Sequence, residues 1–448
     1  MLVALGLYVL YVLGTYLAIA ALLARLCKPR QHTIGIFHPY SAAGGGGERV
    51  LFAVLQALSH MRPQSQLVIY TGDSVSVSAL LAQAESYFGL SIPADNVRLV
   101  RLSLRSWTEA AKYPVFTLLG QFCGSAVLVQ EALFRARAHV WIDTHGHAFG
   151  YWFVRVVCGI PVIPYVHYPA MSTDMIQRIR VQRPAYNNST RVTGSATVSR
   201  LKLVYYQVLY IAYSLMGRFV RVAICNSSWT RDHIAALWSC RNVVVFPPCN
   251  IQRFVQLSID KPTANYAVSL GQFRPEKDHE LQIDAFALFY HSHTSLNAKL
   301  LLIGSCRGAE DEARVATLRQ RAQAKGISEA VEFHLNVSFA RLLELLAGAK
   351  VGLHTMWNEH FGICVVELMA AGLVTIAHRS GGPKSDIIEE GKTGYLAETT
   401  EEYAQCLSRA FTEFLELGEL RKAARRASLR YSDESFRENL ITVLRAEI

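Results

Sequence analysis

The chain has 448 residues, a formal net charge of +10 at pH 7 and nine cysteines. Its length is too great for one small core and is typical of two domains. The charge forms no run of five or more like residues. This excludes an obvious nucleic-acid partner and fits an anionic membrane surface or a diphosphate substrate. The cysteines form no C-x-x-C pair, which argues against a disulfide framework or a zinc site.

The first predicted element is a membrane-spanning helix. Residues 2–24 carry no charge, and Arg25, Lys28 and Arg30 follow them. At 1.5 Å per residue, such a helix reaches roughly 35 Å, enough to cross a bilayer core of about 30 Å. A cleaved signal peptide is the alternative, but signal peptides carry their charge before a shorter apolar run. We expect a retained single-pass anchor over residues 1–29, with everything after it in the cytoplasm because the positive charges follow the apolar run.

Short apolar runs then alternate with longer helical patterns, which is typical of parallel sheets covered by helices on both faces. The first series of predicted strands is 32–37, 67–70, 139–142, 161–166, 221–225 and 242–246. The second series is 267–270, 299–303, 331–333, 351–353 and 374–377. The clearest predicted helices between these strands are 48–58, 279–290, 313–324 and 339–347.

A polar stretch at 252–265 separates the two series. We therefore predict an α/β protein with two Rossmann-like domains, over residues 30–260 and 261–430, followed by a C-terminal helix over 431–448. Two apolar stretches of the first domain could also contact lipid. Residues 114–133 are predicted to form a buried helix. Residues 201–216 are equally compatible with a buried helix and with a helix in the membrane interface.

A glycine loop follows the first predicted strand and precedes a helix. Gly44, Gly45, Gly46 and Gly47 let the backbone approach a ligand closely, and the helix N-terminus presents N–H groups to an anion. Their spacing matches neither the dinucleotide-binding fingerprint nor the P-loop. A flexible turn is the alternative. We expect these four glycines to contact a bound donor.

The second domain opens with the same arrangement of strand, glycine and loop. Arg274 and Lys277 lie three positions apart after Gly271, where the carboxyl end of a parallel strand binds ligands. Together they could stabilise a departing diphosphate without a metal ion. Solvated surface charge is the alternative.

Two carboxylates, Glu359 and Glu367, are separated by seven residues around a predicted turn into a helix at Gly362. The start of this helix, with Phe361 and Ile363, would hold phosphate through its N–H groups. A buried carboxylate such as Glu367 needs a partner, and a ribose diol is one. An internal salt bridge is the alternative.

Histidines provide the remaining candidates. His167 ends a predicted strand and is a candidate for contact with the substrate, whereas His145 and His147 are as well explained by packing as by function. A metal site formed by these two histidines with Asp143 is a minor alternative, and the chain contains no Asp-x-Asp pair. We therefore expect neither a metal nor a cofactor.

Together these motifs resemble the retaining glycosyltransferases of family 4, which have the GT-B fold. That family has a Glu-x7-Glu pair, an Arg/Lys pair and a histidine after a strand of the N-terminal domain. The matching residues here are Glu359 and Glu367, Arg274 and Lys277, and His167.

Longer strings narrow the resemblance to the GDP-mannose-dependent α-1,2-mannosyltransferases of dolichol-linked oligosaccharide synthesis. They are FHPYSAAGGGGERVL, YVHYPAMSTDM, GQFRPEKDHELQIDAF and NEHFGICVVELMAAG. The similarity covers nearly all of residues 32–395 and the apolar N-terminus. It departs at Ser41-Ala42, where those enzymes usually have Cys-Asn. The contacts with the acceptor could therefore differ from theirs.

The resemblance implies transfer of the fourth and fifth mannoses from GDP-mannose to Man3GlcNAc2-diphosphodolichol on the cytosolic face of the endoplasmic reticulum. It implies an acceptor domain and a nucleotide-sugar domain that face an interdomain cleft. Glu359 would position the mannose, Glu367 the ribose and His167 the sugar hydroxyls. Other mannosyltransferases of the pathway are candidate partners. A different lipid-linked acceptor, or a membrane scaffold without turnover, is the alternative function.

Overall fold

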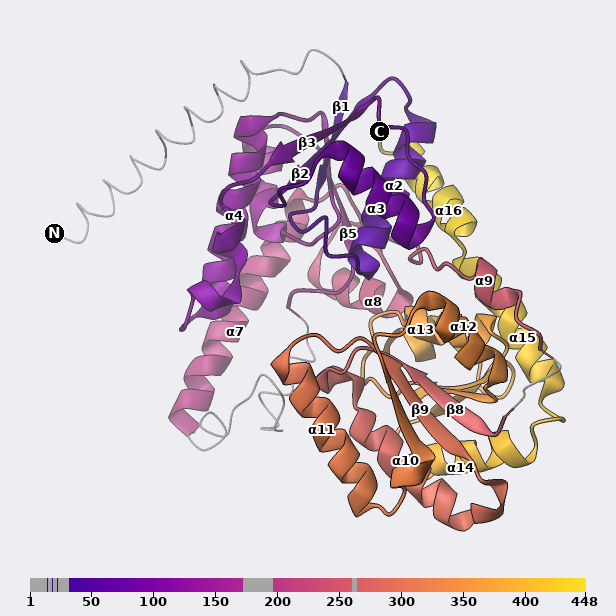
Figure 1. Cartoon of the computed structure of the whole chain (residues 1–448). Helices are drawn as coiled ribbons and strands as arrows, with labels where there is room; N and C mark the ends of the chain where they lie inside the picture. Colours follow the sequence, from indigo (N-terminus) through magenta and orange to yellow (C-terminus); the bar gives the residue numbers. More distant parts are fainter. Residues whose placement is uncertain (1–13, 15–17, 19–21, 23–31, 172–195, 260–263) are drawn as a thin grey trace. The chain divides into compact units, whose positions relative to one another are not determined.

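The structure is a computed structural model that describes residues 32–171, 196–259 and 264–448, together with the isolated positions 14, 18 and 22 (Figure 1). The predicted membrane anchor therefore lies almost wholly outside the described residues. The chain divides into two compact units. The first comprises Met1–Asn226, Thr230–Val245 and Arg437–Ile448, and the second comprises Ser227–Trp229 and Phe246–Phe436.

The first unit contains a parallel seven-stranded sheet in the order β3-β2-β1-β4-β5-β6-β7. The strands are β1 (Thr33–Phe37), β2 (Gln66–Thr71), β3 (Val97–Arg101), β4 (Val140–Asp143), β5 (Val162–Val166), β6 (Val222–Cys225) and β7 (Arg241–Val244). Its order reverses between β1 and β4, the point where such sheets bind ligands. All six predicted strands are confirmed, and β3 is an addition. This edge strand alternates apolar residues with Arg98 and Arg101, so it lacks the continuous apolar run of a central strand.

Helices cover this sheet. The core between helices and sheet includes large aromatic side chains of the strands, such as Tyr70 and Trp141, which are both fully buried. The helices are α2 (Gly46–Met61), α3 (Val77–Phe88), α4 (Thr117–Arg135), α7 (Ala196–Met216) and α8 (Ser228–Leu237). The C-terminal helix α16 (Asp433–Arg445) begins in the second unit and ends in the first. There Glu447 forms ion pairs with Arg221 and Arg241 at 2.6 and 2.9 Å.

The second unit contains a parallel six-stranded sheet in the order β10-β9-β8-β11-β12-β13. The strands are β8 (Tyr266–Leu270), β9 (Lys299–Gly304), β10 (Val331–Leu335), β11 (Val351–Leu353), β12 (Val374–His378) and β13 (Tyr395–Ala397). The five predicted strands are confirmed. The sixth, β13, was not predicted, because the polar, glycine-containing segment 389–394 directly before it is typical of a turn.

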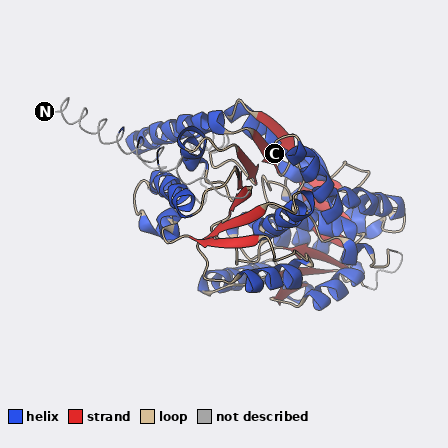
Figure 2. Cartoon of the chain, turned by 90° about the horizontal axis from the view of Figure 1, so that it is seen from above, coloured by secondary structure: helices blue, strands red, loops and turns tan. Residues whose placement is uncertain are grey.

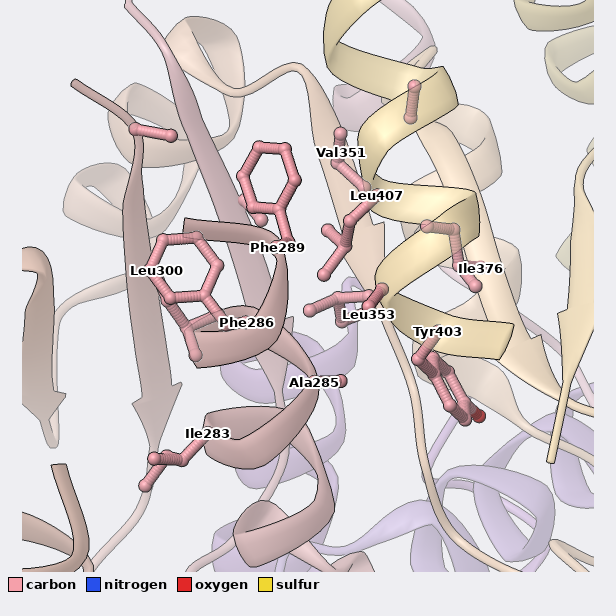
Figure 3. Packing of buried hydrophobic residues seen from close by; sticks show 14 of the residues in the cluster. Ile283, Ala285, Phe286, Phe289, Leu300, Val351, Leu353, Ile376, Tyr403 and Leu407 are labelled. Carbon is pink, nitrogen blue, oxygen red and sulfur yellow. The ribbon is translucent and has the colours of Figure 1, made fainter. Parts of the chain in front are cut away.

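Helices lie on both faces of this second sheet (Figure 2). They are α9 (Gln252–Val255), α10 (His279–Ser292), α11 (Ala309–Ala324), α12 (Phe339–Gly348), α13 (Ile363–Ala370), α14 (Thr400–Thr412) and α15 (Gly418–Ser428). On one face, Phe286 and Phe289 of α10 and Leu407 of α14 pack on the strands (Figure 3). This burial of strand residues on both faces explains why their sequences are apolar throughout.

Two helices of the first unit, α4 and α7, lie side by side (Figure 1). The Tyr205 hydroxyl accepts a hydrogen bond from the N–H of Leu119 at 3.0 Å, and the rings of Phe116 and Tyr205 are 5.4 Å apart. Among the described residues, α4 is the one helix long and apolar enough to cross a membrane, and a third of it is buried. Leu128 and Val129 are among its buried residues and belong to the core, so the helix expected over residues 114–133 is present but only partly buried.

Candidate functional site

The main polar cluster of the second unit lies where β8 and β11 end. Lys277 Nζ donates to Glu359 Oε2 at 2.6 Å, and His354 Nε2 lies 3.3 Å from the same oxygen. Because β8 and β11 are neighbours in the parallel sheet, the loops that follow them emerge at the same edge. The structure thus brings together two of the predicted site residues and adds His354, which the sequence analysis missed.

Burial and mutual contact shift the pKa of all three groups. Burial by itself raises the pKa of Glu359, but the hydrogen bonds and charges of His354 and Lys277 lower it well below its usual range. Burial lowers the pKa of Lys277, and the Glu359 carboxylate reverses this and raises it. Burial also lowers the pKa of His354, yet Cys364 and Glu359 together raise it to about 9. One carboxylate therefore lies between two basic side chains.

His354, Glu359 and Cys364 also have the composition of a metal site, since their ligand atoms lie within 4.8 Å of one another. The Lys277 ammonium, however, already contacts Oε2 of Glu359. Its positive charge would repel a divalent ion. This arrangement favours a site in which Lys277 supplies the cationic charge.

The loop that carries Lys277 is held by the end of β11. The hydroxyl of Thr355 lies 2.8 Å from the Lys277 carbonyl and 3.0 Å from that of Asp278. Gln282 on α10 donates to the same hydroxyl at 2.8 Å. The backbone of Lys277 is therefore fixed relative to β11, and only its flexible side chain remains to adjust to a ligand.

The loop that carries Glu359 rests on a second loop after β12. The Gly382 N–H donates to the Glu359 carbonyl at 2.7 Å, and Ser380 Oγ accepts from the Asn358 N–H at 2.7 Å. A Cβ on Gly381, whose φ is +61°, would come within 2.2 Å of the Glu359 carbonyl oxygen. Only glycine fits this position. The sequence analysis missed these residues, although a predicted strand followed by glycine and a loop is the signal it used at the other two loops.

The helix expected after Gly362 is present as α13, and Gly362 caps it with a φ of +111°. Glu367 lies within α13 and is half-buried. Phe361 is buried in the core, with its ring 5.8 Å from Phe246 and 5.3 Å from Tyr431. Only the main chain of Phe361 is therefore available to a donor, whereas half-buried Ile363 begins the helix.

Arg274 does not accompany Lys277 in this cluster. It is exposed and lines a cavity of about 370 Å³ that also borders Arg314 of α11. Within the described part of the chain, its guanidinium forms no hydrogen bond or ion pair. The two basic residues thus start from different positions, and convergence on one diphosphate requires the long Arg274 side chain to turn.

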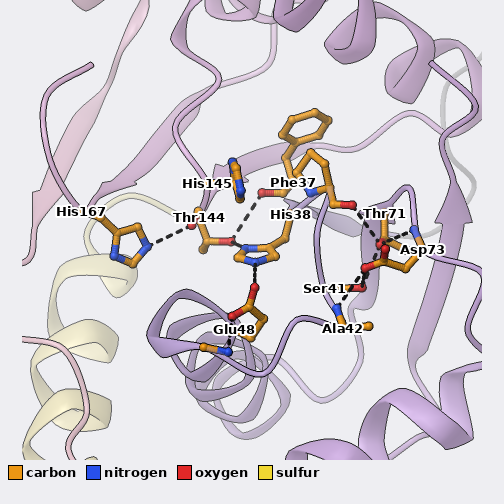
Figure 4. A network of polar contacts seen from close by, with 12 residues as sticks. Phe37, His38, Ser41, Ala42, Glu48, Thr71, Asp73, Thr144, His145 and His167 are labelled. Carbon is orange, nitrogen blue, oxygen red and sulfur yellow. Dashed lines mark hydrogen bonds and ion pairs between the residues drawn. The ribbon is translucent and has the colours of Figure 1, made fainter. Parts of the chain in front are cut away.

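In the first unit, a buried network joins the ends of β1, β4 and β5 (Figure 4). His38 Nδ1 is 2.8 Å from Thr144 Oγ1, and His167 Nε2 donates to the Thr144 carbonyl at 3.1 Å. Burial lowers the pKa of His167 to about 4, so the ring is neutral at pH 7. Since Nε2 carries the proton, Nδ1 is an acceptor and can receive a hydrogen bond from a hydroxyl.

The glycine loop joins β1 to α2, as expected, and belongs to the first unit. Glu48 in the first turn of α2 accepts a hydrogen bond from the Gly45 N–H at 2.6 Å, and its other oxygen lies 3.7 Å from His38 Nε2. The carboxylate thus occupies the positive end of the helix. This weighs against a phosphate at the Gly45 amide and leaves Gly44, Gly46 and Gly47 as backbone that a ligand can approach.

Asp143 has a structural role at the end of β4. Its carboxylate accepts hydrogen bonds from the N–H groups of His145, Gly146 and His147 and from the Tyr151 hydroxyl, at 2.6–2.8 Å. His147 Nε2 faces His145 Nδ1 at 3.1 Å. These contacts tie down the loop and use both oxygens of Asp143. The positions of Asp143, His145 and His147 are therefore explained by these contacts without a metal ion.

Beside this loop is a cavity of about 540 Å³ at the point where the strand order reverses. Tyr40, Gln121, His145 and Tyr168 contribute polar groups to its wall, and Phe122 and Phe149 contribute aromatic faces. Tyr40 is fixed between the His145 ring, 5.3 Å away, and the Arg105 guanidinium, 4.7 Å away. Aromatic faces next to hydrogen-bonding groups suit the two chemical faces of a pyranose ring.

Comparison with known proteins identifies the family. Residues 31–238 match a family model described as ALG11 mannosyltransferase N-terminus, and residues 252–430 match Glycosyl transferases group 1. A mouse protein named GDP-Man:Man(3)GlcNAc(2)-PP-Dol alpha-1,2-mannosyltransferase is 44% identical over 91% of this chain and 85% of its own length. The chain belongs to this mannosyltransferase family. Family members of the same name from human and Dictyostelium discoideum are 43% and 37% identical, over 91% and 92% of this chain and 85% and 84% of their own lengths.

Similarity to solved structures shows that this chain has the GT-B fold, with two Rossmann-like domains that each contain a parallel sheet. Sucrose-phosphate synthase from Thermosynechococcus elongatus aligns with a TM-score of 0.67 and 15% identity, over 93% of this chain and 99% of that one. Anabaena HepE, crystallised with UDP and glucose, aligns with a TM-score of 0.61 and 16% identity, over 93% of this chain and all of that one. These similarities concern the fold alone.

Proposed function

We propose that this chain transfers mannose from GDP-mannose to Man3GlcNAc2-diphosphodolichol, forming the α-1,2 bonds of the fourth and fifth mannoses at the cytosolic face of the endoplasmic reticulum. Family membership carries the proposal, because relatives up to 44% identical over 91% of the chain bear this activity in their names. The Lys277–Glu359 pair supports it, since a reaction that releases a diphosphate needs a cation where that group departs.

In this proposal the second unit binds the donor. Lys277 and Arg274 stabilise the departing diphosphate, Glu359 orients the mannose, and Glu367 binds the ribose hydroxyls. The main chain from Phe361 to Ile363 faces the phosphates at the start of α13. The bond from C1 of mannose to the diphosphate breaks and a bond from C1 to the acceptor oxygen forms on the same face. The acceptor's proton passes to the leaving diphosphate, and GDP is released.

The first unit binds the acceptor. The 540 Å³ cavity beside Tyr40 and His145 has the mixed aromatic and polar wall that an oligosaccharide needs. Neutral His167 accepts a hydrogen bond from a sugar hydroxyl through Nδ1. Gly44, Gly46 and Gly47 of the glycine loop lie on the same unit and offer backbone that a substrate can approach.

Membrane attachment completes the proposal. The apolar N-terminus is a single-pass anchor, and exposed apolar side chains of the first unit form a second contact. On α7 they recur every three or four residues and form one stripe: Val204, Val208, Ile211 and Leu215. The opposite face of α7 packs in the core through Leu209 and Tyr213. A helix that is apolar on both faces supports the interfacial interpretation of residues 201–216 over full burial.

The purified full-length protein, supplied with several radiolabelled nucleotide sugars and a Man3GlcNAc2-diphospholipid, tests the reaction. We expect transfer from GDP-mannose that gives products with one and two added α-1,2-linked mannoses. This activity should persist in excess EDTA. Transfer only to another lipid-linked acceptor would establish the first alternative. Binding without turnover on any acceptor would establish the scaffold, and rescue of EDTA-treated protein by Mg²⁺ would revive a metal site.

A further inference from the structure

His354 is a buried histidine to which the proposed reaction assigns no role. It directly follows β11, and its ring is 3% exposed. Its main-chain N–H donates to the Ile376 carbonyl on β12 at 2.9 Å, and its carbonyl accepts from the Tyr403 hydroxyl on α14 at 2.8 Å. These contacts anchor the backbone on both sides, and burial of the ring leaves it little room to move.

The ring of His354 shares one acceptor with Lys277. His354 Nε2 lies 3.3 Å from Oε2 of Glu359, and Lys277 Nζ lies 2.6 Å from the same oxygen. The Glu359 side chain is only 15% exposed. A carboxylate taken out of water in this way stays ionised only while it keeps a cationic or donating partner. Glu359 has two such partners, of which His354 is a buried ring on an anchored backbone and Lys277 is on a long flexible side chain.

Donor binding changes this balance. If Lys277 serves the departing diphosphate, its ammonium must turn at least partly from Glu359 to the phosphate oxygens. We propose that His354 is a positioning residue that holds Glu359 ionised and correctly oriented toward the sugar when Lys277 engages the diphosphate. This inference rests on the proposed function of the site.

The charge of the surroundings is consistent with this role. Burial opposes protonation of His354, but Glu359 and Cys364 outweigh it and raise its pKa above the usual value. The titratable groups around His354 are Glu359 and Cys364, His279 and His378, Lys277 through the shared Glu359 oxygen, and Tyr403 through the His354 carbonyl. Of these, Lys277, His279 and His378 are cationic when protonated and oppose a charge on His354, whereas Glu359 favours it.

His354→Phe and His354→Gln in the full-length protein test the inference, because phenylalanine keeps the ring shape and glutamine keeps a neutral donor. A hydrogen bond to a charged group is worth roughly 10- to 100-fold. We expect His354→Phe to lower kcat and GDP-mannose affinity by about that factor, with GDP affinity nearly unchanged. The acid limb of its kcat–pH profile should move to higher pH, because Glu359 becomes easier to protonate, and His354→Gln should fall between His354→Phe and wild type.

His334→Gln, in a half-buried histidine that pairs with Glu332 on β10, is the matched control and should match wild type. GDP affinity reports folding of each variant, and His354→Gln decides the question where His354→Phe does not fold. An unchanged ratio of GDP-mannose to GDP affinity together with an unchanged acid limb would overturn the inference. Absence of GDP-mannose binding and transfer in the wild-type protein would instead reject the proposed function.

Discussion

Lys277 Nζ lies 2.6 Å from Glu359 Oε2, although 82 residues separate the two along the chain. Each residue follows a different strand, and the adjacency of β8 and β11 brings them together. The ammonium and the carboxylate neutralise each other in a site that must later bind an anion. Donor binding therefore exchanges one partner of Lys277 for another, which makes this pair the most informative target for substitution.

Lys277→Ala should reduce kcat by roughly 10²-fold or more, because a charge-assisted contact to the departing diphosphate is lost. Steady-state kinetics with GDP-mannose measures this effect. Arg274→Ala should lower kcat in the same direction, and the double variant should fall short of additive because both residues serve one group. Turnover of folded Lys277→Ala within a few-fold of wild type would contradict the assigned role.

Gly381→Ala should disrupt the loop that carries Glu359. The new Cβ would meet the Glu359 carbonyl oxygen at 2.2 Å, in addition to the strain of a φ of +61°. Gly391→Ala is the matched control, since Gly391 has a φ of +72° but no atom within 4 Å. Both variants should lose about 1 kcal/mol of stability from backbone strain, and only Gly381→Ala should also lose at least about tenfold in kcat. Equal activity of the two would refute this coupling.

Acid should destabilise the first unit through buried His147, which is 8% exposed. Burial and the charge of His38 lower its pKa to about 3. Below an unfolded pKa of about 6.5, the unfolded chain then binds more protons than the folded one. Stability is complete above that pH and declines as the pH falls toward 3, by about 2 kcal/mol at pH 5. Thermal melts from pH 7 to 5 should show a smaller loss for His147→Gln than for wild type.

A truncated chain that begins at Arg30 should retain GDP-mannose binding, because the proposed chemistry resides in the two units. It should also sediment partly with anionic vesicles through the exposed stripe of α7. Added salt should weaken the electrostatic part of this binding. Val208→Glu with Ile211→Glu should abolish sedimentation. Leu415→Glu, at a 92% exposed leucine of the second unit, should not. Flotation of the truncated chain free of vesicles at low salt would disprove this second membrane contact.

Much of the fold could be predicted from local sequence. Central parallel strands are buried on both faces, so their apolar runs stand out, and eleven of the thirteen strands were predicted on that basis. Edge strand β3 escaped because Arg98 and Arg101 interrupt its apolar residues, and edge strand β13 escaped because a polar, glycine-containing segment precedes it. Glycine loops after strands likewise marked Gly44–Gly47 and the region of Lys277 without any knowledge of topology.

Which residues lie next to one another in space could be known only from the tertiary structure. The position of His354 against Glu359, the support from Gly381 and the separation of Arg274 from Lys277 depend on strand order and on side-chain direction. The double-sided apolar character of α7 likewise emerged only when its buried and exposed faces were known. Residue type and spacing determine which groups are available and where each loop leaves its strand. Which groups share one oxygen atom is decided by the packing of strands that are distant in sequence, because those contacts form only after the sheet has assembled.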